Sequence, residues 1–131
     1  MAAIRILLDT HTLLWWLFDD PKLSRKARQA IADPRTEAVV SSASAWEIAA
    51  KHRLGKLPEA GDVATRLPAH LRAGRFTELP ISVEHALQAG RLPGPHRDPF
   101  DRMLIAQAAV ENLRIVTNDP IFRDYGARVI W

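Results

Sequence analysis

The chain has no cysteine, so it can form neither a disulfide nor a thiolate metal site. Any metal ion that it binds must therefore be held by oxygen or imidazole ligands. Oxygen ligands favour Mg²⁺ or Mn²⁺. The absence of one residue type thus already limits the metal chemistry that this protein can perform.

Long apolar runs are also absent. No segment approaches the roughly 18 continuous apolar residues of a membrane-spanning helix. The first residues, MAAIRILLD, lack the long apolar core and cleavage site of a secretory signal. We therefore expect a cytoplasmic protein with no membrane association. The 18 basic and 15 acidic residues give a net charge of +3, which permits a polyanionic partner without requiring one.

The length of 131 residues suffices for one domain with its own core, and a second domain is not expected. Hydrophobic residues make up 47% of the chain and charged residues 25%, which is the usual balance of a globular protein. No repeat or linker interrupts the chain. We therefore predict a single domain over residues 1–131.

Short apolar runs alternate with segments of helical periodicity. The runs predict strands at residues 4–8, 37–42, 77–82, 114–119 and 128–131. The periodic segments predict helices at residues 12–18, 25–32, 45–54, 62–74, 83–90 and 99–113, with Ser24 and Ser44 opening the second and third. Because parallel strands need a crossover that a helix supplies, this alternation predicts a three-layer α/β/α fold with a mostly parallel sheet.

Five acidic residues fall where such a fold would bring them to one edge. In open sheets of this kind, ligands bind beyond the carboxyl ends of the strands, where the chain order reverses. Asp9 and Asp119 follow predicted strands, and Glu47 lies in the first turn of a predicted helix. Asp98 and Asp101 begin the helix that precedes the last long strand. We therefore expect these carboxylates to converge.

Each acid also has a purely structural explanation. Asp9 and Asp119 could be turn formers after strands. Ser44 and Glu47 match a capping box, and Asp98 matches an N-terminal cap. These explanations do not account for a convergence of the acids. Carboxylates about 4 Å apart repel by about 1 kcal/mol in water, and they repel more strongly where the dielectric constant is lower. Unless one carboxylate stays protonated, the cluster needs a divalent cation to relieve that repulsion, and the chemistry of such an ion on a phosphate is phosphodiester hydrolysis.

Four blocks in fixed order resemble a known family over essentially the whole chain. They are "LLDTHTLLWWL", "SSASAWEIAAKHRLGKL", "DPFDRMLIAQA" and "IVTNDPIF", followed by a terminal "VIW". These blocks resemble the PIN-domain ribonucleases, specifically the toxin subunit of VapBC-type toxin-antitoxin modules. The resemblance implies RNA cleavage, an acidic pocket that binds Mg²⁺ or Mn²⁺, and neutralisation by a small cognate antitoxin.

The resemblance also implies roles for individual residues. The four acids of the family fall on Asp9, Glu47, Asp101 and Asp119, with Asp98 as the cap or an outer ligand of the third block. Thr117 is expected to support the fourth acid through its hydroxyl. The family also makes plausible a homodimer face or an antitoxin groove, either of which exposed aromatic and aliphatic residues on the two early helices could build.

Basic and aromatic residues supply weaker signals. Lys51 and Arg102 could hold RNA phosphate, although ordinary solvated helix faces explain each of them equally well. The tryptophans at positions 15, 16 and 46 could stack on unpaired bases, but their apolar helices favour core or interface packing.

Functions of other classes fit less well. A haloacid-dehalogenase-type phosphatase has a second acid two residues after the first, where this chain has His11. A receiver-like module needs paired acids after the first strand and a late lysine, which "LLDTH" and "VTND" do not supply. His11 is not needed as a base, because a metal ion can activate water without it. A non-catalytic PIN-like or receiver-like domain that binds RNA or a protein stays open as the alternative.

Overall fold

The core of the fold is one parallel sheet with the strand order β3-β2-β1-β4-β5. The computed structural model describes residues 4–131, so residues 1–3, at the start of the predicted domain and of the MAAIRILLD segment, lie outside it. The strands are β1 (Ile4–Leu8), β2 (Thr36–Ser41), β3 (Thr77–Leu79), β4 (Arg114–Val116) and β5 (Val129–Ile130). All pairings in this sheet are parallel, which confirms the predicted fold class.

Helices connect the strands in sequence, as parallel pairing requires. They are α1 (Thr10–Leu17), α2 (Arg25–Ala32), α3 (Ser42–Arg53), α4 (Gly61–Ala73), α5 (Val83–Arg91), α6 (Pro99–Glu111) and α7 (Ile121–Asp124). The short helix α7 was not predicted. Four residues are too few to show helical periodicity in the sequence.

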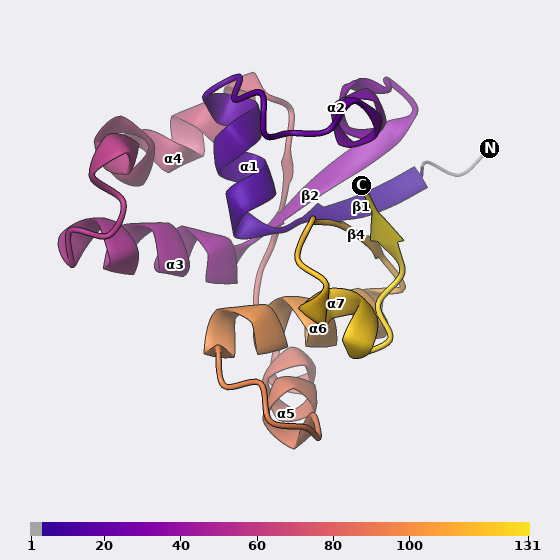
Figure 1. Cartoon of the computed structure of the whole chain (residues 1–131). Coiled ribbons are helices and arrows are strands. Elements are labelled where there is room, and N and C mark those ends of the chain that lie inside the picture. Colours follow the sequence, from indigo (N-terminus) through magenta and orange to yellow (C-terminus); the bar gives the residue numbers. More distant parts are fainter. Residues whose placement is uncertain (1–3) are drawn as a thin grey trace.

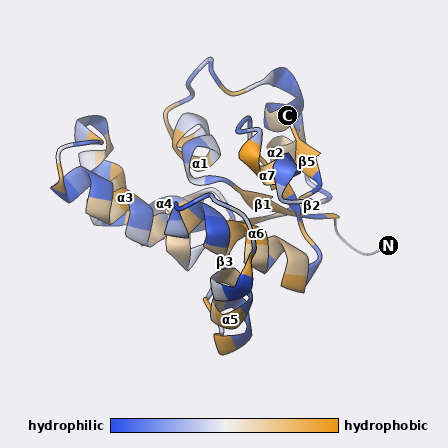
Figure 2. Ribbon diagram, turned by 60° about the horizontal axis from the view of Figure 1, so that its bottom comes forward, coloured by the Kyte–Doolittle hydropathy of each residue, from blue (hydrophilic) through white to orange (hydrophobic). Residues whose placement is uncertain are grey.

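The helices form two layers, one on each face of the sheet (Figure 1). One core cluster packs side chains of α1, α2, α3 and α4 against one face, including Ile6 and Val40 from the strands. The other packs α6 and Phe122 of α7 against the opposite face, including Leu7 and Val39. Since successive strand residues point to opposite faces, neighbours such as Ile6 and Leu7 enter different cores. Figure 2 shows β1 in hydrophobic colours and the outer helices in both colours.

Two helices differ from their predicted form. Helix α3 begins at Ser42, directly after β2, and Ser41 is its cap because the Ser41 hydroxyl accepts a hydrogen bond from the N–H of Ala43. The prediction that Ser44 opens this helix is therefore wrong. Helix α4 contains Pro68 as expected, and it is kinked at Arg66. The kink agrees with the clash that a proline makes with the preceding turn.

Strands β3 and β4 are shorter than predicted. β3 ends at Leu79 because Pro80, which follows it, has no N–H to donate to a neighbouring strand. β4 ends at Val116, and residues 117–119, which were predicted to continue it, lie outside the strand. Within residues 4–131, no helix has the length and apolar character needed to cross a bilayer.

The register of the two central strands positions the first acid. Leu8 of β1 pairs with Val116 of β4, so Asp9 and Thr117 follow side by side at the carboxyl edge. The N–H of Asp9 extends the ladder by donating to the carbonyl of Val116 over 3.1 Å. The chain runs from β1 outward in both directions at this point, so this is the switch point where open parallel sheets bind ligands.

Candidate functional site

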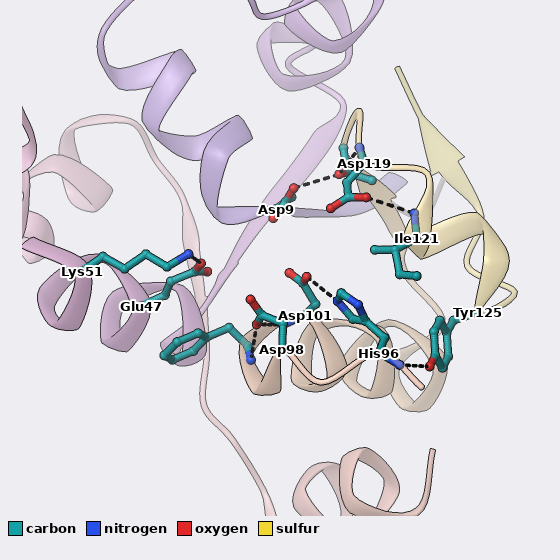
Figure 3. Close-up of polar contacts among 11 residues, drawn as sticks. Asp9, Glu47, Lys51, His96, Asp98, Asp101, Asp119, Ile121 and Tyr125 are labelled. Carbon is teal, nitrogen blue, oxygen red and sulfur yellow. Dashed lines mark hydrogen bonds and ion pairs between the residues drawn. The ribbon is translucent and has the colours of Figure 1, made fainter. Parts of the chain in front are cut away.

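The predicted acids gather at this edge from four separate elements (Figure 3). Asp9 follows β1, Glu47 lies on α3, and Asp119 lies in the turn after β4. Asp98 and Asp101 lie at the start of α6. The acids therefore converge on one edge of the sheet, as expected.

Asp9 is almost fully buried, with 6% of its surface exposed. It occupies the N-cap position of α1, yet its side chain does not cap the helix. Its carboxylate instead accepts a hydrogen bond of 2.8 Å from the hydroxyl of Thr117. The explanation of Asp9 as a turn former is therefore not supported, because its carboxylate serves no turn.

The surroundings of Asp9 disfavour its charged form. The pKa of Asp9 is raised to about 7, chiefly by burial and also by the negative charges of Asp101 and Glu47, while the Thr117 hydrogen bond opposes the rise. A buried carboxylate in a low-dielectric site that also faces like charges is unstable without a cation. Asp9 is thus a carboxylate whose ionised form needs a positive partner.

The hydroxyl of Thr117 contacts two acids of the site, the predicted Asp119 and also Asp9. Its hydroxyl donates to Asp9, and its oxygen accepts the backbone N–H of Asp119 over 3.0 Å. The expected support of the fourth acid by this hydroxyl is thus present at the backbone N–H of Asp119, and the same hydroxyl also holds the carboxylate of Asp9. The contact with Asp9 follows from the strand register, which pairs Leu8 with Val116 and so places Thr117 beside Asp9.

Glu47 is buried, with 3% of its surface exposed, and it pairs with Lys51 one turn later on α3. The capping-box explanation is wrong, because α3 begins before Ser44 and the hydroxyl of Ser44 bonds to that of Thr10 instead. The Lys51 ammonium donates to Oε2 of Glu47. The other carboxylate oxygen, Oε1, is buried and has no hydrogen-bond partner among residues 4–131. A buried carboxylate oxygen without a partner is costly and indicates a missing one.

Lys51 is the cation that the fold itself supplies to the cluster. Burial disfavours its charged form, but the hydrogen bond and charge of Glu47, together with Asp98 and Asp101, more than offset this, and the pKa of Lys51 is raised. Lys51 therefore stays protonated and neutralises part of the acidic charge. One ammonium is set against several carboxylates, so the cluster keeps an excess of negative charge.

Asp98 and Asp101 perform different tasks at the start of α6. Asp98 is the cap, since its Oδ1 accepts the N–H groups of Phe100 and Asp101 over 2.9 and 3.0 Å. Asp101 lies mostly out of solvent, and its Oδ2 lies 2.8 Å from Nε2 of His96. Burial raises the pKa of Asp101, repulsion from Asp98 and Glu47 adds to this, and the His96 hydrogen bond opposes it.

His96 is a residue of the site that the sequence prediction missed. It lies in the loop before α6, and no metal-ligand spacing singles it out. The available signal was its position five residues before Asp101, in a segment rich in turn residues that must lie beside the start of the helix.

Asp119 is the acid whose role in the site the structure defines least. Its Oδ1 accepts the N–H of Ile121 over 3.0 Å, which closes the turn leading into α7. Its side chain is half-buried. The turn-former explanation therefore describes one oxygen of Asp119, and the other carboxylate oxygen faces the same edge as Asp9 (Figure 3).

The donor set fits a divalent cation. All the acids supply oxygen ligands, the unpartnered Oε1 of Glu47 is buried among them, and Asp9 and Asp101 repel. Among residues 4–131, no three acidic or histidine side chains already surround a single point. The structure thus brings the predicted ligands to one edge without closing them into a finished cage.

The remaining predicted residues lie as follows. Arg102 donates to the carbonyl of Leu92, and its guanidinium lies 5.9 Å from the ring centre of Tyr125. Trp15 packs on the core beside Trp131, and its companion at position 16 packs on the same core. Trp46 is 62% exposed and contacts Phe100 edge-on. The packing prediction thus holds for the two tryptophans of α1, and RNA contact by Arg102 stays a prediction.

Comparison with known proteins agrees with this geometry. The sequence pattern of the PIN domain matches residues 6–128. Ribonuclease VapC22 of Mycobacterium tuberculosis is 31% identical over 123 residues, covering 92% of this chain and 91% of that protein. Ribonuclease VapC16 of the same organism is 41% identical over 75 residues, 54% of this chain, and the match spans only 52% of its length.

The fold is also similar to a solved structure. The crystal structure of VapBC2 from Rickettsia felis, bound to a DNA fragment from its promoter, superposes with a TM-score of 0.71 at 17% identity. The superposition covers 96% of this chain and 97% of that one. From the match to the domain pattern and the whole-length similarity to VapC22, the chain belongs to the PIN-domain family and, within it, to the VapC proteins.

Proposed function

We propose that this protein is a metal-dependent endoribonuclease and the toxin of a type II toxin-antitoxin pair. It hydrolyses phosphodiester bonds of RNA, and Asp9, Glu47, Asp101 and Asp119 hold Mg²⁺ or Mn²⁺, with Asp98 as an outer ligand. Because the substrate is cellular RNA, we place the protein in the cytoplasm. The names of the VapC relatives support the ribonuclease activity.

The observation that carries this proposal is the uncompensated charge at the switch point. Burial and the charges of Asp101 and Glu47 together raise the pKa of Asp9 to about 7. Such an arrangement lowers the stability of the protein by itself, and it is explained if a divalent cation completes it. When bound, such an ion stabilises the negative charge that develops on a phosphodiester as water attacks it.

The side chains of this chain have distinct tasks in that reaction. Thr117 fixes the orientation of the Asp9 carboxylate through its hydrogen bond. Lys51 neutralises Glu47 and keeps two further N–H donors, so it is better placed than Arg102 to hold a phosphate of the RNA. The backbone N–H groups at the start of α6 are satisfied by Asp98, which leaves the carboxylate of Asp101 free of capping.

The test compares Asp9→Asn with Asp19→Asn. The first change keeps the shape of the side chain and removes charge from the cluster. The second removes an exposed carboxylate that pairs with Arg28 on the surface. We expect Asp9→Asn to abolish cleavage of total cellular RNA and to relieve growth arrest on induction, whereas Asp19→Asn does neither. EDTA should stop cleavage by the wild type, and Mg²⁺ or Mn²⁺ should restore it.

The result that would overturn this assignment is equal cleavage by Asp9→Asn and the wild type. Binding of RNA without cleavage by either protein would favour the alternative, a non-catalytic PIN-like or receiver-like domain. Circular dichroism of Asp9→Asn separates both results from a failure to fold. Mapping of RNA ends after brief induction, with Asp9→Asn as the reference, then identifies the RNA that is cut.

We propose a small antitoxin as the protein partner, as VapBC pairs suggest. An apolar groove beside the acidic edge is lined by Trp46, Ile81, Phe100 and Met103, among other residues. A partner helix with apolar side chains fits such a groove, and its position allows the partner to block the acids. A search for a small antitoxin gene immediately upstream, followed by co-expression and co-purification of its product with this chain, tests this. Trp46→Ser should weaken the complex, and Trp46→Phe should preserve it.

We propose that two copies of the chain associate through α5. Val83 and Leu87 lie one turn apart on this helix and are 77% and 50% exposed. Large apolar side chains on one helix face are typical of interfaces. Light scattering should give the mass of a dimer for the wild type and of a monomer for Val83→Asp, with Glu84→Gln as the control on the same helix. A monomeric wild type would contradict this.

A further inference from the structure

The loop before α6 places His96 beside Asp101, which lies in the first turn of that helix. Nε2 of His96 lies 2.8 Å from Oδ2 of Asp101. When Asp101 is ionised it can only accept, so Nε2 carries the proton and donates it. The Asp101 carboxylate points toward the space beside Asp9, with the ring of His96 behind it (Figure 3). One carboxylate oxygen is thus held by the protein and the other is left free.

We infer that His96 is a positioning residue for the divalent-cation site: its hydrogen bond to Oδ2 fixes the Asp101 carboxylate in the orientation that binds the ion. This inference rests on the proposed function. A carboxylate that is already oriented loses less side-chain entropy when it binds an ion, and partners of metal ligands raise metal affinity in this way.

The structure holds His96 in place from its other side. The backbone N–H of His96 donates to the hydroxyl of Tyr125 over 3.1 Å, and the two rings lie 6.3 Å apart. Gly94 has φ of +90°, and a Cβ at this position would lie 2.5 Å from the Tyr125 hydroxyl. The loop therefore approaches Tyr125 closely because residue 94 has no side chain. Tyr125 follows α7, so the C-terminal part of the chain fixes the residue that orients Asp101.

Arg102 fixes the same loop from the helix. Its Nη2 donates to the carbonyl of Leu92, and its guanidinium lies over the ring of Tyr125. The loop is thus held at both ends, by Arg102 near its start and by Asp98 and Tyr125 near its end. Histidine in a loop held in this way keeps one orientation, which a ligand-positioning residue requires.

The chain contains a matched control. His70 and Asp62 form a second histidine–aspartate pair with the same distance of 2.8 Å, on the exposed surface of α4. Both residues of this pair lie on α4, whereas the acids at the sheet edge lie on or beside β1, α3, α6 and β4. The same substitution at His96 and at His70 therefore separates an effect at the acidic site from the general effect of losing such a pair.

The experiment measures Mn²⁺ binding by calorimetry for the wild type, His96→Ala, His96→Gln and His70→Ala. We expect His96→Ala to weaken binding about 10-fold, which is the lower end for partners of metal ligands. His96→Gln should regain most of that affinity, because the glutamine Nε2–H₂ can donate from a similar position. His70→Ala should bind Mn²⁺ as the wild type does. Cleavage by His96→Ala should recover as the Mn²⁺ concentration is raised.

Unchanged Mn²⁺ affinity in His96→Ala would overturn the inference and leave the proposed function intact. Equal losses in His96→Ala and His96→Gln would also overturn it, since the donated hydrogen bond would then not matter. Absence of Mn²⁺ binding by the wild type would overturn the proposed metal site together with the inference. If His96→Ala fails to fold, Tyr125→Phe serves as a second variant. It keeps the ring and removes the acceptor that holds His96, and it should weaken Mn²⁺ binding in the same direction.

Discussion

The hydroxyl of Thr117 donates a hydrogen bond of 2.8 Å to Oδ2 of Asp9, joining two residues that lie 108 positions apart in the sequence. Both residues are buried, and each directly follows a central strand. The bond exists because β1 and β4 pair in a register that sets Leu8 opposite Val116. This contact links Asp9, the first acid of the site, to the end of β4, the strand that leads to the fourth acid, Asp119.

Thr117→Val should therefore reduce RNA cleavage while the protein still folds. Valine keeps the shape of threonine but donates no hydrogen bond, so the carboxylate of Asp9 is less well oriented and its pKa rises further. The N–H of Asp119 also loses its acceptor. We expect kcat to fall about 10-fold, measured with a fluorogenic RNA oligonucleotide.

The matched variant for this prediction is Thr117→Ser, which keeps the hydroxyl and removes only a methyl group. It should cleave within a factor of a few of the wild type. Wild-type activity in Thr117→Val would show that the hydrogen bond to Asp9 does not contribute to the reaction.

Asp9→Asn should stabilise the metal-free protein at neutral and alkaline pH. The pKa of Asp9 is raised from 3.8 to about 7 in the folded state, chiefly by burial. Between these values the unfolded chain loses the proton and the folded protein keeps it, so wild-type stability falls as pH rises through this range. A shift of this size corresponds to about 4 kcal/mol. Asparagine does not titrate, so its advantage in Tm should grow from about pH 5 to about pH 8.

Asp33→Asn is the control, because the pKa of Asp33 is shifted in the opposite direction to that of Asp9 and affects stability in a different pH range. Hydrogen bonds from Arg35 lower the pKa of the exposed Asp33 to about 2. Its contribution is present above its ordinary pKa and is lost only as pH falls toward 2, so it is constant between about pH 5 and about pH 8. A Tm difference for Asp9→Asn that is independent of pH would contradict a protonated Asp9 in the metal-free fold.

Lys51→Met should destabilise the metal-free protein and make its stability depend more strongly on added Mn²⁺. Removal of the ammonium leaves the buried Glu47 without its only positive partner among the described residues. We expect a loss on the order of 2 kcal/mol in the free energy of unfolding, measured by urea denaturation. Mn²⁺ should recover part of that loss, because the ion supplies the missing positive charge.

The double variant Lys51→Met with Glu47→Gln tests whether the unpaired charge of Glu47 causes the loss of stability. Glutamine carries no charge, so the double variant should be more stable than Lys51→Met alone. Equal stability of the two variants would show that the buried charge of Glu47 is not the cause of the loss.

Gln107→Leu should destabilise the fold without touching the acids. Gln107 is fully buried on α6, where its oxygen accepts the hydroxyl of Ser41 and its amide lies 3.3 Å from Nδ1 of His85. Leucine removes both contacts and leaves the buried Ser41 hydroxyl without the acceptor for its proton, at a cost of roughly 2 kcal/mol in urea denaturation. Gln29→Leu, at an exposed position of α2, should change stability by much less. Equal effects of the two substitutions would contradict the role of this buried network.

Local patterns in the sequence predicted most of the fold because they report burial directly. The apolar run at 4–8 and the periodicity at 25–32 became β1 and α2 with the predicted bounds. The start of α3 was wrong because Ser41 and Ser44 are equally good caps in isolation. The choice between them depends on where β2 ends against its neighbours. The length of β4 was overestimated for a similar reason, because pairing in the sheet rather than composition ends that strand.

The sequence by itself determined the alternating α/β architecture and the identities of the acids, because hydrophobic periodicity and residue type are properties of the chain alone. Only the tertiary structure decided how those acids are held. The register of β1 against β4 gives Thr117 to Asp9, and the loop fixed on Tyr125 gives His96 to Asp101. Lys51 differs, because it reaches Glu47 from one turn later on the same helix. The contacts of Asp9 and Asp101 join separate elements, so they depend on how the strands and helices pack, which the local sequence around either acid does not contain.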